Sequence, residues 1–348
     1  MDILPLAHPH DHLARHFLSN VDLAADFLRN YVAREVMDKL DLDRLRCESP
    51  VKVDSELVER IGDLRFSTGF KEGGPGSEIF IFFEHQSSQD RFIPFRIFDY
   101  IAASYREIRR AAGAAAKSGE IFPYPLAVVL YHGQSPWSGP LKMHELIKKH
   151  PGLPGEILDF PVYLVDLAKI PAEKIRGAPP VRALLSALRA ASDRELGKRL
   201  AAILRTAAEE REEFRRKNWV RALLRYFICL EKPPGGMKGM VGMLADIFGG
   251  KEAEEMTTSL AEELIRQGEA RGEARGEAKG EARGEAKGEA KAILMVLGAR
   301  FGFVPADIRE AVESRSDPLA LEPLTVHAAT CKNIMEFRVG LRQGFVQK

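Results

Sequence analysis

A run of five apolar residues, Ile79 to Phe83, constrains the fold of this chain more than any other feature. It is too short for a typical helix and is rich in β-branched and aromatic residues, so it predicts a strand buried on both faces. Glu84, His85 and Gln86 follow directly. Because side chains alternate along a strand, we expect Glu84 and Gln86 on one face and His85 on the other. A carboxylate at the end of a buried strand costs free energy unless something binds it, which makes this strand end a candidate functional position.

A second carboxylate, Asp63, opens another short apolar segment upstream. Two carboxylates on neighbouring strands, with Gln86 able to position a water, indicate a hard-cation site for metal-assisted hydrolysis. The alternative is that both acids are solvated residues at strand ends, and the spacing by itself is permissive enough to favour that interpretation.

The remaining N-terminal half alternates helical and strand patterns. Apolar residues at helical spacing from Leu13 to Leu40 predict short helices, and a Gly-rich loop at 71–77 predicts a hairpin. The expected strands cover about 50–54, 62–68, 78–86, 126–131 and 162–167. A helix at about 94–117 should use Phe95, Phe98, Ile101, Tyr105 and Ile108 as its apolar side. This order predicts a mixed α/β sheet with helices packed on it.

Several short strings in this half occur in a recognisable order. They are His10-Asp11, Phe17-Leu18, Ala24-Ala25-Asp26-Phe27-Leu28, Leu42-Asp43, Glu48-Ser49, Val53-Asp54, Asp63-Leu64, Phe83-Glu84-His85-Gln86-Ser87-Ser88, Pro94-Phe95-Arg96 with Tyr100, Pro125-Leu126, and Tyr131-His132-Gly133. Together they resemble the bacterial family of transposase-like and recombination-promoting nucleases, within the PD-(D/E)XK nuclease superfamily.

The resemblance implies a PD-(D/E)XK, restriction-endonuclease-like core and a Mg²⁺-dependent DNA endonuclease, with Mn²⁺ or Ca²⁺ as alternative ions. Asp63 and Glu84 would ligate the metal, the backbone carbonyl of His85 would complete the coordination, and Asp54 would be an auxiliary acid. Gln86 would stand where many members of the superfamily carry a lysine. An amide can orient water but supplies no positive charge. A noncatalytic nucleic-acid-binding or assembly protein with the same fold therefore stays an alternative, as does an RNA-directed nuclease.

Basic and histidine residues offer weaker hypotheses. Arg91, Arg96 and Arg106 are candidate DNA contacts, although an ordinary charged helix face is the favoured interpretation. His8, His10, His12 and His16 form a cluster that is more typical of a solvated tail than of a metal site. Tyr131-His132-Gly133 follows a strand and could flank the cleft, but strand termination is the favoured account.

Composition predicts a cytoplasmic protein with no membrane association. No apolar run approaches the roughly 20 residues that cross a bilayer, and Met1–Pro5 lacks an export signal. The three cysteines, Cys47, Cys229 and Cys331, are spaced as reduced core thiols. The net charge of +1 neither supports nor excludes a nucleic-acid partner.

The chain divides by pattern into four parts. A nuclease domain at 1–175 precedes a helical region at 176–267, a low-complexity tract at 268–291 and a small helical unit at 292–348. The tract repeats Gly-Glu-Ala-Arg/Lys, whose glycines and i,i+4 like charges disfavour an isolated helix. We expect a long helix stabilised by a partner helix, giving a homodimer through the tract and the C-terminal unit; a solvent-exposed helix or linker is the alternative.

Overall fold

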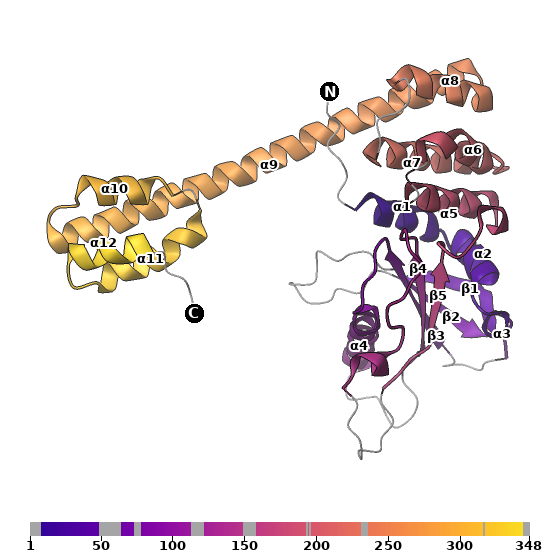
Figure 1. Cartoon of the computed structure of the whole chain (residues 1–348), viewed down its shortest axis with the longest axis horizontal. Helices are drawn as coiled ribbons and strands as arrows, with labels where there is room; N and C mark the ends of the chain where they lie inside the picture. The colour runs from indigo at the N-terminus through magenta and orange to yellow at the C-terminus, as the bar shows by residue number, and fades with distance from the viewer. Residues whose placement is uncertain are drawn as a thin grey trace, which may run out of the picture. The chain divides into compact units, whose positions relative to one another are not determined.

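The computed structural model describes residues 8–48, 64–72, 78–112, 122–148, 158–192, 194, 196–230, 236–315 and 317–343 (Figure 1). Two compact units divide between Ala261 and Glu262. The N-terminal unit is a sheet with helices on both faces and further helices beyond, and the C-terminal unit is helical.

The sheet of the N-terminal unit contains five strands in sequence order. They are β1 (Leu40–Glu48), β2 (Leu64–Phe70), β3 (Glu78–Gln86), β4 (Tyr124–Tyr131) and β5 (Val162–Asp166). β1, β2 and β3 pair antiparallel, whereas β4 is parallel to β3 and to β5. The predicted mixed α/β sheet is therefore confirmed, and every residue of β3 after Glu78 is buried, as its apolar run predicted.

Different helices cover the two faces of this sheet (Figure 1). On one face, α4 (Ile93–Ala112) packs Ile93, Ile97 and Ile101 against Phe80 and Phe82 of β3. On the other face lie α1 (Pro9–Leu18) and α2 (Val21–Tyr31), where the rings of Phe27 and Phe83 are 5.4 Å apart between centroids. Alternation along β3 thus gives each helical layer its own set of strand side chains.

Further helices extend the second layer. α5 (Pro179–Ser192) and α7 (Glu213–Leu230) pack on α1, and α6 (Leu196–Ala208) packs on both α5 and α7. α8 (Gly236–Phe248) follows against α6. The short elements are α3 (Arg34–Met37) and two 3₁₀ helices, η3 (Met143–Leu146) and η4 (Ala172–Lys174).

Two local predictions were wrong. Leu40 was expected to end a helix but begins β1, whose pairing with β2 shifts register between Asp41 and Arg46, so its apolar residues do not alternate regularly. The predicted strand at 50–54 lies outside the described residues. Phe95 was placed on the apolar side of α4 but is 45% exposed, and Ile93 and Ile97 are buried instead.

The C-terminal unit forms a small helical core of its own. α9 (Gly250–Phe301) is a single helix of 52 residues that contains the repeat tract, as expected. It ends at Phe301, and the next residue, Gly302, takes a positive φ of 77° that L side chains rarely adopt. α10 (Ala306–Glu313), α11 (Pro318–Thr330) and α12 (Ile334–Gln343) then pack on Ile293 and Leu297 of α9.

The C-terminal end of the repeat tract belongs to this core through the buried Ala286 and Ala290, whereas its glycines are open. A β-carbon built on Gly272, Gly276, Gly280, Gly284 or Gly288 meets no atom within 4 Å apart from the adjacent helix backbone. Within the described ranges, no helix combines the length and apolar character needed to cross a bilayer. Of the cysteines, Cys331 is buried as expected, whereas Cys47 is exposed.

Candidate active site at the end of β3

Three consecutive polar residues close β3 and are almost fully buried. Glu84 is 1% exposed, His85 7% and Gln86 9%. Alternation turns Glu84 and Gln86 toward the face covered by α4 and His85 toward the face covered by α1, as the sequence predicted. The strand end therefore separates two polar clusters by the thickness of one sheet.

The first cluster, here called the carboxylate cluster, consists of Glu84, Gln86 and Arg96. The side-chain amide of Gln86 donates to Oε1 of Glu84 at 2.5 Å, and Nη2 of Arg96 lies 2.6 Å from the same oxygen. Arg96 projects from the first turn of α4 and also pairs with Asp90 at 3.4 Å. A buried carboxylate is costly alone, so the guanidinium and the amide together compensate its charge.

The second predicted carboxylate, Asp63, and the auxiliary acid, Asp54, lie outside the described residues, so their distances from Glu84 stay predictions. Chain connectivity nevertheless limits Asp63: it precedes Leu64, whose Cα pairs with that of Phe83, the residue before Glu84. Adjacent Cα atoms are about 3.8 Å apart. The sequence therefore ties Asp63 to the strand that neighbours Glu84.

Glu84 supplies one oxygen ligand of the type that hard cations prefer. Within the part of the chain that the structure describes, no group of three or more His, Cys, Asp or Glu side chains is arranged to hold a metal ion. Asp166, at the end of β5, is a buried acid, but its oxygens accept backbone N–H groups from Trp137 and Ala168. Its role is thus to fix the loop after β4.

The three arginines predicted to contact DNA differ in position. Arg91 and Arg106 are exposed on the surface near and on α4. The side chain of Arg96 is only 18% exposed and engages Glu84 and Asp90. Contact with DNA stays a prediction for all three, but the contacts of Arg96 link it to the carboxylate cluster.

On the opposite face lies a histidine cluster, formed by His10, His85 and His132 with Asp11. Nδ1 of His85 is 2.7 Å from Oδ1 of Asp11. The rings of His85 and His132 stack with centroids 4.8 Å apart, and His10 approaches His132 at the same centroid distance. Two strands and α1 thus bring together residues from three distant parts of the chain.

Neighbouring hydroxyl groups fix the outer rings of this cluster. Nδ1 of His10 is 2.7 Å from the hydroxyl of Tyr226 on α7, and Nδ1 of His132 is 2.9 Å from Oγ of Ser192 on α5. Oγ of Ser192 faces the backbone carbonyls of His132 and Leu188, to either of which it can donate. We therefore assign the ring proton of His132 to Nδ1, which donates to Oγ and leaves Nε2 as an acceptor.

Burial keeps the outer rings uncharged. Burial, assisted by the charge of His85, lowers the pKa of His10 from 6.5 to about 4, and the same two causes hold the pKa of His132 well below 6.5. Burial alone would raise the pKa of Asp11, but its hydrogen bond and charge interaction with His85 outweigh that effect and lower it. His10 and His132 are therefore neutral at pH 7.

These contacts correct the interpretation of the N-terminal histidines as a solvated tail. His8 and His16 are exposed, but His10 lies partly buried on α1. His16 nevertheless packs edge-on against Trp219 with ring centroids 5.5 Å apart, and partial burial of its ring lowers its pKa. The helical spacing of His10 with Leu13 and Phe17 was the signal that His10 belongs to the packed side of a helix.

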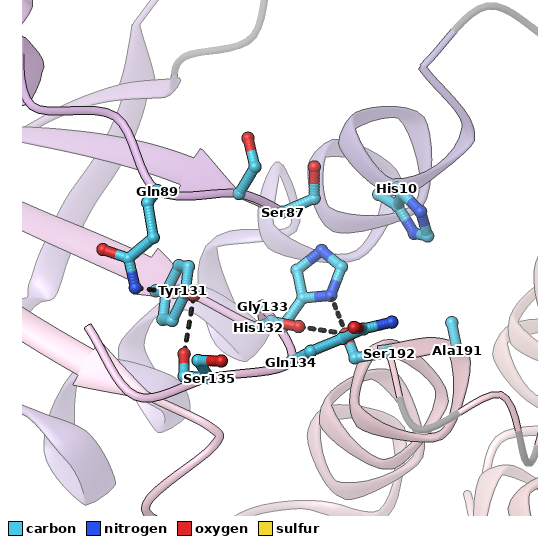
Figure 2. Close-up of a pocket in the computed structure, with 11 residues that line it drawn as sticks. His10, Ser87, Gln89, Tyr131, His132, Gly133, Gln134, Ser135, Ala191 and Ser192 are labelled. Atoms are coloured by element: carbon cyan, nitrogen blue, oxygen red, sulfur yellow. Dashed lines mark hydrogen bonds between the residues drawn. The ribbon is translucent and has the colours of Figure 1, made fainter. Parts of the chain in front are cut away.

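A pocket of about 460 Å³ opens beside the histidine cluster, where β3 and β4 end (Figure 2). Its lining consists of His10, Ser87, Ser88, Gln89, Tyr131, His132, Gly133, Gln134, Ser135, Ala191 and Ser192. Figure 2 shows Ser87 and Gln89 on one side of His132 and Gln134 and Ser192 on the other. Strand termination alone was thus an incomplete account of Tyr131-His132-Gly133; the polar residues after two parallel strands were the available signal.

Comparison with known proteins identifies the region that carries both clusters. Residues 8–217 match the family described as "Putative transposase, YhgA-like". Recombination-promoting nuclease RpnD of Escherichia coli O157:H7 is 31% identical over 134 residues, which cover 37% of this chain and 48% of that protein. Recombination-promoting nuclease RpnA of Escherichia coli K12 is 32% identical over 130 residues, covering 37% of this chain and 42% of RpnA.

A third relative is named as inactive. "Putative inactive recombination-promoting nuclease-like protein YjiP" of Escherichia coli K12 is 35% identical over 95 residues, covering 27% of this chain and 90% of YjiP. The chain spans less than half the length of RpnD and RpnA. No solved structure matches. The family match covers more than half of the chain and includes the sheet, the carboxylate cluster and the histidine cluster, and the chain therefore belongs to the YhgA-like transposase family, with distant homology to the recombination-promoting nucleases.

Proposed function

We propose that this protein is a metal-dependent DNA endonuclease with a PD-(D/E)XK-like core. The observation that carries the proposal is the pair of Glu84 and Gln86, buried side by side on one face of β3 within the region shared with the recombination-promoting nucleases. The relatives' names supply the reaction class and its link to recombination. The mixed sheet is compatible with this core.

In the proposed mechanism, Asp63, Glu84 and the backbone carbonyl of His85 would hold Mg²⁺, or Mn²⁺ or Ca²⁺ in its place, and Asp54 would assist as an auxiliary acid. A bound divalent ion polarises the phosphodiester and lowers the pKa of its water. Gln86 orients the attacking water through its amide, which a hydrogen bond to Glu84 already fixes in position.

Arg96 supplies a positive charge in the proposed site. Gln86 cannot supply the positive charge of the lysine that many superfamily members carry, whereas the guanidinium of Arg96 lies 2.6 Å from Oε1 of Glu84. A bound cation would compete with this guanidinium for the oxygen, and Arg96 would then be available to donate hydrogen bonds to a phosphate oxygen.

A noncatalytic nucleic-acid-binding or assembly protein is the second candidate. Two observations favour it: Glu84 already has a cationic partner in Arg96, and some relatives are named inactive. This alternative keeps the fold and the nucleic acid but predicts no turnover.

Metal-dependent cleavage distinguishes the two functions. Purified full-length protein is incubated with plasmid DNA or with RNA, in Mg²⁺ with and without a chelator. We expect DNA cleavage that the chelator abolishes. Loss of a metal ligand should lower the rate at least 100-fold, about 3 kcal/mol of transition-state stabilisation, in Asp63→Ala and Glu84→Gln.

Glu78→Gln is the matched control, because Glu78 lies at the exposed start of the same strand. Gln86→Ala should slow cleavage with little loss of folding stability, whereas Gln86→Lys should preserve or raise the rate. Equal rates for the wild type and Asp63→Ala would overturn the proposed site. Cleavage of RNA but not of DNA would show that the substrate is RNA.

We further propose homodimerisation through the repeat helix and the C-terminal unit, since each chain supplies one cutting site for a two-stranded substrate. Glycines without neighbours within 4 Å leave room for a second helix to approach. Deleting residues 268–291 should lower the mass measured in solution by light scattering. A monomeric wild type, or a dimer that survives the deletion, would contradict this assembly.

A further inference from the structure

The pocket beside the histidine cluster carries an inference beyond the hydrolytic site. It lies where the parallel strands β3 and β4 end, a position at which open α/β sheets commonly bind ligands. Its volume of about 460 Å³ falls within the range typical of small-molecule sites. Ser87, the residue after Gln86, forms part of the lining, so the pocket directly follows the carboxylate cluster along the chain.

The chemistry of the lining excludes a site built for an anion. None of its described residues is Asp, Glu, Lys or Arg; they are hydroxyls, amides, imidazoles and small residues. A phosphate or carboxylate would find no cation here, while a neutral group with several donors and acceptors would find many partners. The imidazole of His10 adds an aromatic surface at the pocket rim.

A buried atom in the wall also lacks a partner. Nε2 of His132 is fully buried and accepts no hydrogen bond, and the same holds for Nε2 of the stacked His85. Since Nδ1 of His132 donates to Ser192, its Nε2 is an acceptor that requires a donor. In Figure 2 this nitrogen points away from Ser192, toward the side where Ser87 and His10 lie.

We propose that this pocket binds a nucleobase of the nucleic acid that the carboxylate cluster acts on. A nucleobase is uncharged, planar and edged with donors and acceptors, which matches a lining of hydroxyls, amides and neutral rings. Ser87, Ser88 and Gln134 read the edge of the base, His10 stacks on it, and Nε2 of His132 receives an N–H donor. Enzymes that flip a base out of its stack recognise it by hydrogen bonds to its edge and by stacking on its face.

This inference rests on the proposed function for the identity of the substrate, but its test does not depend on cleavage. The four deoxynucleosides carry the base without any phosphate, so they probe the pocket alone. For ligands of this size we expect dissociation constants of about 0.1–1 mM, within reach of saturation-transfer NMR on the full-length protein.

Ser87→Ala and Gln134→Ala each remove a neutral hydrogen-bonding group from an exposed side of the pocket, so folding should be unaffected. Each should weaken nucleoside binding about 2- to 10-fold. Ser138→Ala is the matched control, because Ser138 is exposed on the same loop but does not line the pocket. Its binding should equal that of the wild type.

The outcomes separate the two proposals. No nucleoside binding, or binding that both pocket variants leave unchanged, overturns the nucleobase pocket even if metal-dependent cleavage is intact. Nucleoside binding that the two variants weaken supports the pocket even if no cleavage is found, and in that case only the nuclease proposal fails.

Discussion

The two faces of β3 stabilise buried ionisable groups in different ways. Both bury ionisable groups at the strand end, yet the carboxylate cluster keeps its charge and balances it, while the outer rings of the histidine cluster give up their charge. Arg96 compensates Glu84 directly on one face. On the other, burial among rings and helices favours neutral imidazole. The difference shows that one strand, with residues a single position apart, can hold a balanced ion pair on one face and neutral outer imidazoles on the other.

The comparison predicts that the carboxylate cluster is the more fragile of the two. Arg96→Gln leaves the carboxylate of Glu84 buried without its cation, which should lower the free energy of unfolding by about 3–5 kcal/mol. The measurement is urea unfolding followed by circular dichroism.

The double variant Glu84→Gln with Arg96→Gln removes both charges and should recover part of this loss. Arg91→Gln, an exposed arginine just before the same helix, serves as the control and should change stability by less than about 0.5 kcal/mol. A loss no larger in Arg96→Gln than in Arg91→Gln would show that the pair does not balance a buried charge.

The histidine cluster should respond less strongly to the loss of its acid. Asp11→Ala removes the acceptor of His85 Nδ1 and should cost about 1–3 kcal/mol, since a buried donor is then left without a partner. Asp22→Ala, near the start of α2 and 68% exposed, is a control for the substitution itself. A cost for Asp11→Ala above that of Arg96→Gln would reverse the proposed order of the two faces.

Acid should destabilise the fold through the histidine cluster. The folded-state pKa values of His10 and His132 lie below 6.5, so the unfolded chain takes up protons first as pH falls. For His10, stability is therefore unaffected above pH 6.5 and declines between pH 6.5 and about 4, and protonation of His132 acts in the same direction. Urea midpoints measured across this window test the sign.

His10→Asn, which cannot titrate, should flatten part of that pH dependence. His8→Asn should not, because His8 is exposed on the same segment. Identical slopes for the wild type and His10→Asn would remove His10 from the pH response.

The sequence predicted the elements that depend on local patterns. The apolar run of β3 and its alternation indicated the buried strand and the opposite directions of Glu84 and His85, and the structure confirms both. β1 was missed because its register shift breaks the alternation that identifies a strand. Only Glu84 and Gln86 of the predicted catalytic residues lie among the described residues; the proposed pairing with Asp63 stays a prediction.

The contacts that sequence could not supply are those between distant segments. His10, His85 and His132 approach one another only because α1 crosses the end of the sheet, and no local spacing reports that. Likewise, the sequence separation between Glu84 at a strand end and Arg96 in the next helix does not reveal an ion pair. Arg96 looked like a surface cation until α4 placed it on Glu84. Tertiary packing therefore determines which charged residues form ion pairs.

The pairing of Glu84 with Arg96 has a consequence for how the sequences of family members diverge. A copy that loses the carboxylate alone keeps Arg96 paired with Asp90, whereas a copy that loses the arginine alone keeps a buried anion. The second copy should be the less stable, so in a diverging sequence position 84 is expected to change before position 96 or together with it. Substitution at position 96 that is accompanied by substitution at position 84, rather than occurring alone, would be the evolutionary trace of this contact.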